Sequence, residues 1–354
     1  MTLNNTLTDI LPIANRFSNA VAQITPLGNG LINDTYLVST ASSPFVLQRI
    51  NSKVFPSPEH MMANLTTLNR HIAQKVGVSV KLQIPEVLKT TDNAVLYQDE
   101  SGDCWRALRF IDNTESIESL CTIDDAEQTG FALGHFHRLI SDLNPSLLHD
   151  TLPGFHITPE YLKHYHRVLQ QPANKQDRYC TEFIARFQAI ADDLENAKRQ
   201  NLLPLRVIHG DQKLNNFLFD RQSKKIVSII DLDTVKPGLI HYDIGDCLRS
   251  CCYSAEPVGF NLEICAALLK SYLNEAGTFF TEHDYHYLYP AIRLIPFELG
   301  IRFYTDYLEG NRYFKVAEPE QNLQRASNQF RLCKNIMEQE TAIKGLISQL
   351  QKRN

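Results

Sequence analysis

A cluster of polar residues follows a short apolar run in the second half of the chain, in "VIHGDQKLNN" (residues 207–216). Asp211 and Asn216 are five positions apart, and Asp231 lies fifteen positions beyond Asn216, in "IIDLDT". The loop ends beside two short strands can bring these three oxygen-bearing side chains to one point. Such ligands suit Mg²⁺, which usually keeps waters and substrate phosphates as its other ligands. We therefore predict that Asn216 and Asp231 bind magnesium.

The same cluster contains a candidate base and a candidate cation. Asp211 is left free to accept a proton from an attacking hydroxyl group. Lys213 places a positive charge where negative charge spreads over a transferring phosphoryl group. An Asp base, an Asn ligand and a later metal-binding Asp occur in this order in kinase catalytic loops. A hydrogen-bonded turn between two strands is the simpler interpretation, but the order and the spacing of the residues favour a kinase.

A glycine-containing turn lies near the N-terminus, in "GNGLIND", where Gly28, Asn29, Gly30 and Asn33 follow a predicted strand. By itself this pattern is typical of an ordinary hairpin turn. Its position before a predicted helix and before the catalytic cluster favours a loop that covers the phosphates of a nucleotide.

Two kinds of periodicity divide the chain. The first third has the pattern of strands broken by turns, with a helix from Pro58 onward. From about residue 117 the apolar spacing becomes helical, interrupted by two short strands around the polar cluster. We expect a bilobed α+β fold. Residues 1–112 would form a small β-rich nucleotide-binding lobe with one main helix, and residues 113–354 a larger, mainly helical catalytic lobe, with a hinge at about 110–118.

The composition is that of an ordinary globular protein, with 43% hydrophobic and 21% charged residues. A net charge of −5 and a pI near 6.2 argue against nucleic-acid binding through overall positive charge. The sequence predicts no membrane span and no signal peptide. Eight scattered cysteines, none in a C-x-x-C pair, favour reduced thiols in a cytoplasmic protein. A monomer and a homodimer both remain open.

These motifs resemble those of the aminoglycoside phosphotransferase and choline kinase superfamily, which has a protein-kinase-like fold. The resemblance rests on "HGDQKLNN", "IIDLDT" and "YDIGDCLRS", and it covers roughly residues 10–345. A closer similarity, to bacterial N-acetylhexosamine 1-kinases, rests on "GNGLINDTYLV", "FVLQRIN", "IDLDTVKPG" and "ELGIRFYTDYLEGNRYF".

The resemblance implies that ATP and Mg²⁺ are the cofactors, and that Asp211 orients a sugar hydroxyl. It places Lys213 near the γ-phosphate, residues 28–33 over the phosphates, and backbone groups near Phe110 to Asp112 on the adenine. Asp243 would brace the catalytic loop, as would the ring of His209.

The resemblance also implies that Arg302 and Tyr313 contact the sugar. Two structural alternatives stay open. Arg302 has Glu298 and Asp306 one helical turn away on either side, which allows a surface ion pair. Tyr313 could be a core aromatic with a hydrogen-bonded hydroxyl. Asp233 is either a group behind the metal ligands or a local cap.

One departure from the protein-kinase pattern concerns the third strand, "FVLQRIN". Gln48 stands where those enzymes carry a nucleotide-binding Lys, and Arg49 points to the other face of the strand. The helix that follows offers Asn64 where the Glu partner of that Lys would stand. We interpret this as a neutral Gln48–Asn64 pair at the nucleotide site. The N-acetylhexosamine 1-kinases resemble this sequence in lacking the Lys.

The predicted function is that of an ATP-dependent kinase that phosphorylates the anomeric 1-hydroxyl of N-acetylglucosamine or N-acetylgalactosamine by direct in-line transfer. A kinase of the same fold for choline, homoserine, an aminoglycoside or another sugar is the alternative. A nucleotide-binding pseudokinase is a third hypothesis, opposed by the intact Asp211, Asn216 and Asp231. A metal-dependent phosphohydrolase is a fourth, and it lacks the extra ligands that a two-metal site usually needs.

Overall fold

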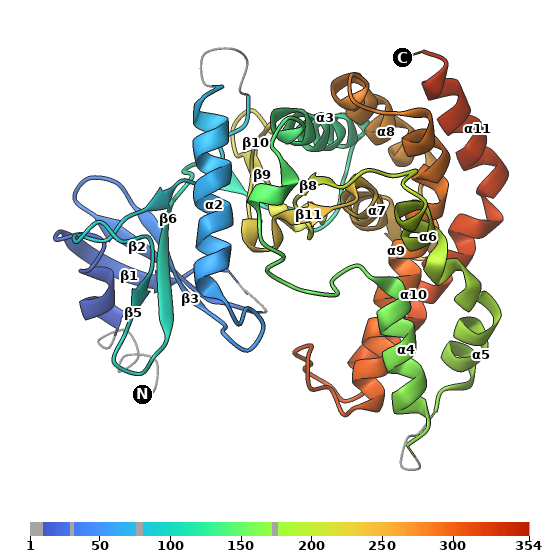
Figure 1. Ribbon diagram of the computed structural model, residues 1–354, viewed down its shortest axis with the longest axis horizontal. Coiled ribbons are helices and arrows are strands. Elements are labelled where there is room, and N and C mark those ends of the chain that lie inside the picture. The colour runs from blue at the N-terminus through green and yellow to red at the C-terminus, as the bar shows by residue number, and fades with distance from the viewer. Residues whose placement is uncertain (1–9, 29–31, 76–80, 172–175, 354) are drawn as a thin grey trace.

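The computed structural model describes residues 10–28, 32–75, 81–171 and 176–353 (Figure 1). The expected α+β fold is confirmed, with an antiparallel sheet in the N-terminal part and mostly helices in the rest. None of the helices in these ranges is both long enough and apolar enough to cross a membrane.

The N-terminal part is an antiparallel sheet with strand order β1-β2-β3-β6-β4, in which β5 also pairs with β6. Its strands are β1 (Val21–Pro26), β2 (Asp34–Thr40), β3 (Phe45–Ile50), β4 (Val87–Leu88), β5 (Tyr97–Gln98) and β6 (Cys104–Arg109). Phe45 and Leu47 of β3 pack with Trp105 and Ala107 of β6 on one face of the sheet. Because side chains alternate along a strand, Gln48 and Arg106, which lie opposite each other in register, share the other face.

The helix α2 (Pro58–Ala73) covers that second face. Pro58 occupies its first turn, where a missing N–H costs nothing. Met61 packs with Ile50 and Cys104 of the sheet. Leu65 and Leu68 instead join the main core of the C-terminal part. The helix therefore lies between the sheet and the rest of the molecule, as Figure 1 shows.

The C-terminal part is mainly helical. Its elements are β7 (Thr114–Glu115), α3 (Ile123–Ile140), α4 (Thr158–Leu169), α5 (Arg178–Phe187), α6 (Asp193–Arg199), β8 (Arg206–Ile208), β9 (Phe217–Asp220), β10 (Ile226–Ile229), β11 (Lys236–Gly238), α7 (Ile240–Cys251), β12 (Tyr253–Ala255), β13 (Val258–Phe260), α8 (Leu262–Ala276), α9 (Glu282–Leu308), α10 (Gln321–Glu338) and α11 (Glu340–Gln351).

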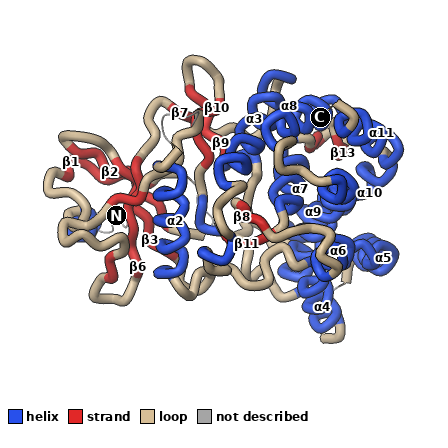
Figure 2. Tube along the Cα trace, turned by 45° about the horizontal axis from the view of Figure 1, so that its top comes forward, coloured by secondary structure: helices blue, strands red, loops and turns tan. Residues whose placement is uncertain are grey.

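Tight helix packing fixes the frame behind the polar cluster. A Cβ atom at Gly130 of α3 would lie 2.1 Å from the Leu268 carbonyl oxygen of α8, and one at Gly134 would lie 2.6 Å from that of Tyr272. The two glycines therefore let the helix backbones approach closely. The four strands β8 to β11 lie between α2 and the helices α3 and α7 in both views (Figures 1 and 2).

Candidate active site

Two antiparallel strand pairs carry the polar cluster. β8 pairs with β11, and β9 pairs with β10. Residues 209–216 connect β8 to β9, and residues 230–235 connect β10 to β11. The Ile230 N–H donates to the Asn216 carbonyl over 2.9 Å, so the two connections lie side by side. Long-range pairing thus brings together two motifs that are separate in the sequence.

The four residues that the sequence singled out meet at these connections. Lys213 Nζ donates to Asp211 Oδ2 over 2.5 Å and lies 4.0 Å from Asp231 Oδ2. Asn216 Nδ2 donates to the backbone carbonyl of Asp211 over 2.5 Å. This bond leaves the amide oxygen of Asn216 as the atom that can coordinate a cation. One base candidate, one cation and two oxygen ligands therefore share one point.

The charged side chains at this point shift one another's pKa values. Burial alone would raise the pKa of Asp211, but the charge and the hydrogen bond of Lys213 lower it to about 2. Burial alone would lower the pKa of Lys213, but Asp211 and Asp231 hold it above the ordinary lysine value. The side chain of Asp231 is 45% exposed, and its partial burial together with the charge of Asp233 raises its pKa to about 7. A cation at Asp231 would relieve this crowding of negative charge.

The residues present fit a magnesium ion. Asn216 and Asp231 supply oxygen atoms, which are the ligands that Mg²⁺ prefers. Across the described ranges, no group of three His, Cys, Asp or Glu side chains could hold a metal ion. A cation here would therefore take part of its ligands from water and from a substrate, as is usual for Mg²⁺.

Buried hydrogen bonds hold the backbone of the catalytic loop. The N–H groups of His209 and Gly210 donate to the two carboxylate oxygens of Asp243, over 2.7 and 2.8 Å. The ring of His209 lies 2.9 Å from the Ile230 carbonyl, which ties the two connections together. Gly210 has φ +90°, and a Cβ atom there would lie 2.6 Å from the Thr234 carbonyl oxygen. Asp243 and His209 brace the loop, as the sequence analysis expected.

A second support was not recognised in the sequence. The ring of His156 lies 3.0 Å from Glu298 Oε1 and 2.7 Å from the Gly210 carbonyl. Both partners are acceptors, so both ring nitrogens must donate and the ring carries a positive charge. Although burial opposes it, the charge of Glu298 raises the pKa of His156. His156 is 54 positions from Gly210 and 142 positions from Glu298, so no spacing pattern in the sequence could have indicated these contacts.

The neutral Gln48–Asn64 pair is not formed, and that interpretation was wrong. Asn64 Nδ2 donates to the carbonyls of Val235 and His149, over 2.9 and 2.8 Å, and its oxygen accepts from the His149 N–H. The amide is thus used to join α2 to the C-terminal part. Gln48 instead contacts its neighbours in the sheet, Thr35 and Arg106.

Asp233 is buried and receives groups from the sheet side. Asn33 Nδ2 donates to its Oδ2 over 2.7 Å, and Arg106 forms an ion pair with its Oδ1. The amide oxygen of Asn33 accepts from the Asn51 N–H over 3.0 Å. Asn33, directly before β2, therefore ties the sheet to the loop that bears Asp231. Gly28 has a left-handed φ of +67° and nothing within 4 Å of a Cβ position.

Two predicted nucleotide-loop residues, Asn29 and Gly30, lie outside the described residues. Phe110 and Asp112 lie in the crossing between β6 and β7. Within the described part of the chain, no hydrogen bond uses the backbone N–H or carbonyl of either residue. Asn113 fixes the crossing, because its Nδ2 donates to Asp220 Oδ2 of β9 over 2.7 Å. The unused backbone groups are available to a ligand.

Arg302 of α9 lies in a box of aromatic rings. Its guanidinium carbon is 5.0 Å from the ring centre of Phe155, 5.1 Å from that of Tyr161 and 5.5 Å from that of Phe314. The ion pairs considered in the sequence analysis are not formed. Glu298 binds His156 and Thr158, and Asp306 accepts three backbone N–H groups from residues 312–314. Arg302 donates no hydrogen bond to any residue that the structure describes.

Tyr313 is 52% exposed, so it is not a core residue. Its N–H donates to Asp306 Oδ1 over 2.7 Å, and its ring meets Phe314 edge-on at 4.8 Å. Although burial opposes it, the groups of Tyr161, Glu298, Tyr313 and Asp211 together raise the pKa of Arg302. Contacts also link Arg302 to the loop of Asp211, because Phe155, which lies against Arg302, is followed by His156, whose ring binds the Gly210 carbonyl.

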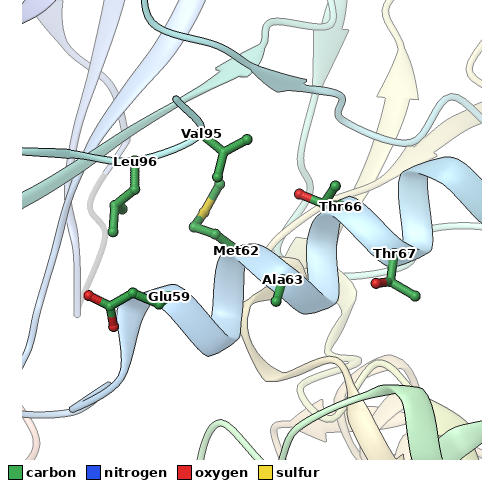
Figure 3. A pocket seen from close by; sticks show the side chains of 7 residues that line it. All are labelled: Glu59, Met62, Ala63, Thr66, Thr67, Val95 and Leu96. Atoms are coloured by element: carbon green, nitrogen blue, oxygen red, sulfur yellow. The ribbon is translucent and has the colours of Figure 1, made fainter. Parts of the chain in front are cut away.

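A separate hollow of about 380 Å³ lies beside α2 (Figure 3). Its lining is mostly apolar and includes none of the catalytic-loop residues. The lining residues are Glu59, Met62, Ala63, Thr66, Thr67, Val95 and Leu96. It lacks the polar groups that a phosphate site needs, so it is not part of the candidate active site.

Known proteins share this architecture. An aminopropanol kinase associated with a microcompartment superposes with a TM-score of 0.66, at 16% identity over 96% of this chain and 98% of its own. A GDP complex of aminoglycoside 2'-phosphotransferase-IIIa gives a TM-score of 0.60, at 16% identity over 94% and 99%. An amicoumacin kinase solved with AMP-PNP and Ca²⁺ gives 0.60, at 15% identity over 93% and 96%. At these identities, the likeness shows the fold.

A sequence relative is an uncharacterized kinase-like protein of Caenorhabditis elegans, 27% identical over 161 residues. The match spans 43% of this chain and 40% of the relative, so it covers less than half of either protein. The model of the phosphotransferase enzyme family matches residues 23–279, which include every residue of the catalytic cluster. Because this match covers more than half of the sequence and the fold agrees with it, the chain belongs to the phosphotransferase enzyme family.

Proposed function

We propose that this phosphotransferase uses ATP and Mg²⁺ to phosphorylate the anomeric 1-hydroxyl of an N-acetylhexosamine, such as N-acetylglucosamine or N-acetylgalactosamine. One observation carries the proposal: Asp211, paired with Lys213 and next to Asn216, follows Gly210, whose carbonyl binds His156, and the neighbouring ring of Phe155 lies against Arg302. Within the described residues, the guanidinium of Arg302 donates no hydrogen bond. A base, a phosphate-binding cation and an acceptor-binding cation then surround one point.

The proposed step is a direct in-line transfer. The acceptor oxygen forms a bond to the γ-phosphorus, its proton passes to Asp211, and the bond from the γ-phosphorus to the bridging oxygen breaks to release ADP. A pKa of about 2 keeps Asp211 ionised at neutral pH. Phosphate oxygens that bind Lys213 would draw it away from Asp211 and make that carboxylate more basic. A bound Mg²⁺, held by Asn216 and Asp231, would neutralise phosphate charge.

The nucleotide would lie between the sheet and the catalytic loop. The unused backbone groups of Phe110 and Asp112 would bind adenine, and residues 28–33 would cover the phosphates. This arrangement divides the chain into residues 1–112, a nucleotide-binding lobe, and residues 113–354, a catalytic and acceptor-binding lobe. The eight unpaired cysteines and the use of ATP support a cytoplasmic setting.

The acceptor would lie against Arg302. Its donors can bind sugar oxygens or the acetamido carbonyl, and the rings of Tyr161 and Phe314 can pack on the apolar face of a sugar. Tyr313, exposed beside them, offers a further hydroxyl. An unpaired positive charge repels polycationic acceptors, so a neutral sugar fits better than an aminoglycoside. A kinase of the same fold for another alcohol, such as another sugar, choline, homoserine or an aminoglycoside, is the second candidate, because the solved relatives include kinases of different small molecules.

The test is release of ADP from MgATP with a panel of acceptors, using Asp211→Asn as the blank. The panel contains N-acetylglucosamine, N-acetylgalactosamine, glucose, galactose, choline, homoserine and kanamycin. Turnover confined to the two N-acetyl sugars, with a 1-phosphate identified by NMR, would support the proposal. Turnover with another acceptor would move the substrate to the second candidate. Binding of ATP without turnover on any acceptor would instead favour a pseudokinase.

A further inference from the structure

On the face of the sheet that α2 covers, β3 carries no positive charge, but the neighbouring strand β6 does. Arg106 of β6 lies directly opposite Gln48 of β3 and is 1% exposed. Its Nε and one terminal nitrogen donate to Gln48 Oε1, over 3.0 and 2.7 Å. Its other terminal nitrogen lies 3.0 Å from the sulfur of Met61 on α2. Arg49 cannot take this place, because it pairs with Asp34 and Asp103 on the exposed face.

The partner of this charge is Asp233, which is 3% exposed. A buried guanidinium and a buried carboxylate each require the other, since neither charge is solvated there. Asn33 binds the second carboxylate oxygen, and the Thr151 hydroxyl donates to the Asp233 carbonyl over 2.9 Å. Arg106 and Asn33, both from the N-terminal part, therefore bind the two carboxylate oxygens of Asp233.

The position of Asp233 in its loop suggests what the Arg106–Asp233 ion pair does. Asp231, two residues earlier, has φ +65° and ψ +51°, a left-handed conformation that a non-glycine residue keeps only when its surroundings impose it. The turn η4 (Leu232–Thr234) follows it directly. Anchoring Asp233 on the sheet side fixes this turn, and with it the direction in which the Asp231 carboxylate points.

We infer that Arg106, which lies opposite the position of the third-strand lysine, is a positioning residue. It acts through Asp233 to hold Asp231 toward the cation of a metal–nucleotide complex, and it couples that ligand to the sheet that would cover the nucleotide. The inference rests on the proposed function, because it takes Asp231 as a ligand of that cation. It assigns Arg106 no contact with the phosphates, since each of the three nitrogens of its guanidinium already has a partner inside the protein.

The test measures metal and nucleotide binding without turnover. Removing only Arg106 leaves a buried charge and risks unfolding, so the main variant is Arg106→Gln/Asp233→Asn, which removes both charges. Binding of Mn²⁺ is followed by electron paramagnetic resonance in the presence of ADP, and binding of ADP is followed separately with EDTA. We expect the double variant to bind Mn²⁺ about 10–100-fold more weakly, as for other residues behind metal ligands, while metal-free ADP binds as in the wild type.

Two further variants separate positioning from general packing. Gln48→Lys/Arg106→Gln returns the charge to the third strand opposite its present place, and it should regain most of the lost Mn²⁺ affinity. Arg49→Gln removes an arginine with acidic partners from the exposed face of the same strand, and it should leave both affinities unchanged. Circular dichroism melting curves check that each variant is folded.

Unchanged Mn²⁺ binding in Arg106→Gln/Asp233→Asn, with normal binding by the wild type, would overturn the inference and leave the proposed function intact. Equal weakening of Mn²⁺ and metal-free ADP would also overturn it, because it would indicate a role in shaping the whole cleft. If the wild type itself bound no Mn²⁺ with ADP, the proposed function would fail and this inference with it.

Discussion

Two arginines, one on each side of the catalytic loop, differ in how their hydrogen-bond donors are used. On the sheet side, Arg106 is 1% exposed, and each nitrogen of its guanidinium has a partner among Gln48, Met61 and Asp233. On the helical side, Arg302 sits among aromatic rings and donates no hydrogen bond within the described residues. A satisfied polar group indicates support, whereas an unsatisfied one near a catalytic residue indicates a binding site.

Asp211 lies between the two sides, and its substitution should cause the largest loss of activity. Asp211→Asn keeps the shape of the side chain but removes the base, so turnover should fall by about 10²–10⁴-fold. The affinity for ADP should stay within about threefold, because the Asn still fits the loop. Single-turnover kinetics and ADP titration measure the two quantities. Activity within tenfold of the wild type would mean that the base is another residue.

The sheet side should respond to mutation mainly in stability. Arg106→Gln leaves the Asp233 carboxylate buried without its counterion, and removing one member of a buried pair costs about 3–5 kcal/mol. Arg302→Gln breaks no hydrogen bond and loses only the contacts with the surrounding rings, so it should cost less, about 0.5–2 kcal/mol. Urea unfolding of both variants measures the difference. Equal losses would mean that the two arginines do not differ as their contacts indicate.

The helical side should respond mainly in acceptor recognition. Arg302→Gln should lower kcat/KM for the acceptor by about 10–100-fold, since a hydrogen bond to a charged donor contributes about 1.5–3 kcal/mol. The KM for ATP should be unaffected, because the proposed function gives Arg302 contact with the acceptor and none with the nucleotide. Initial rates with each substrate varied in turn give both constants. A parallel change in the ATP constant would indicate a structural role for Arg302.

The smallest expected effect concerns the buried pair of His156 and Glu298, which supports the loop from the same helix as Arg302. The pKa of His156 is raised in the fold, so its contribution to stability is complete below about pH 6.5, the ordinary histidine value. That contribution is lost as pH rises through the higher, folded-state pKa. The stability advantage of the wild type over His156→Gln should therefore shrink between pH 6 and pH 9. Urea unfolding across this range checks it, and a constant difference would contradict a charged His156.

Short-range spacing made part of the site predictable. Asp211, Lys213 and Asn216 lie within one loop, so their order alone indicated a shared point, and the change from strand to helical periodicity indicated the α+β fold. The contacts that support the loop could not be predicted in this way. Arg106 and Asp233 are 127 positions apart, and which strand supplies the buried cation depends on the register of β3 and β6.

One error, and one open alternative that the structure excludes, came from treating neighbours in sequence or in motif as partners. Gln48 and Asn64 occupy the places of a known pair, yet α2 turns Asn64 toward Val235 and His149. Glu298 and Asp306 are one helical turn from Arg302, yet each binds other groups. Glu298 binds the ring of His156, and Asp306 accepts backbone N–H groups of the loop that follows α9. A local pattern gives possible partners, and distant groups that need burial or capping decide among them.

The transfer of charge from the third strand to Arg106 also has a consequence for chemical labelling. Reagents that acylate a lysine next to bound nucleotide need a neutral amine, and β3 offers an amide at Gln48 in that position. A guanidinium such as that of Arg106 stays protonated and does not acylate readily. Lys213 is held in its charged form by Asp211 and Asp231. Surveys of nucleotide-binding proteins that rely on amine-reactive probes would therefore tend to overlook this enzyme even while it is fully active.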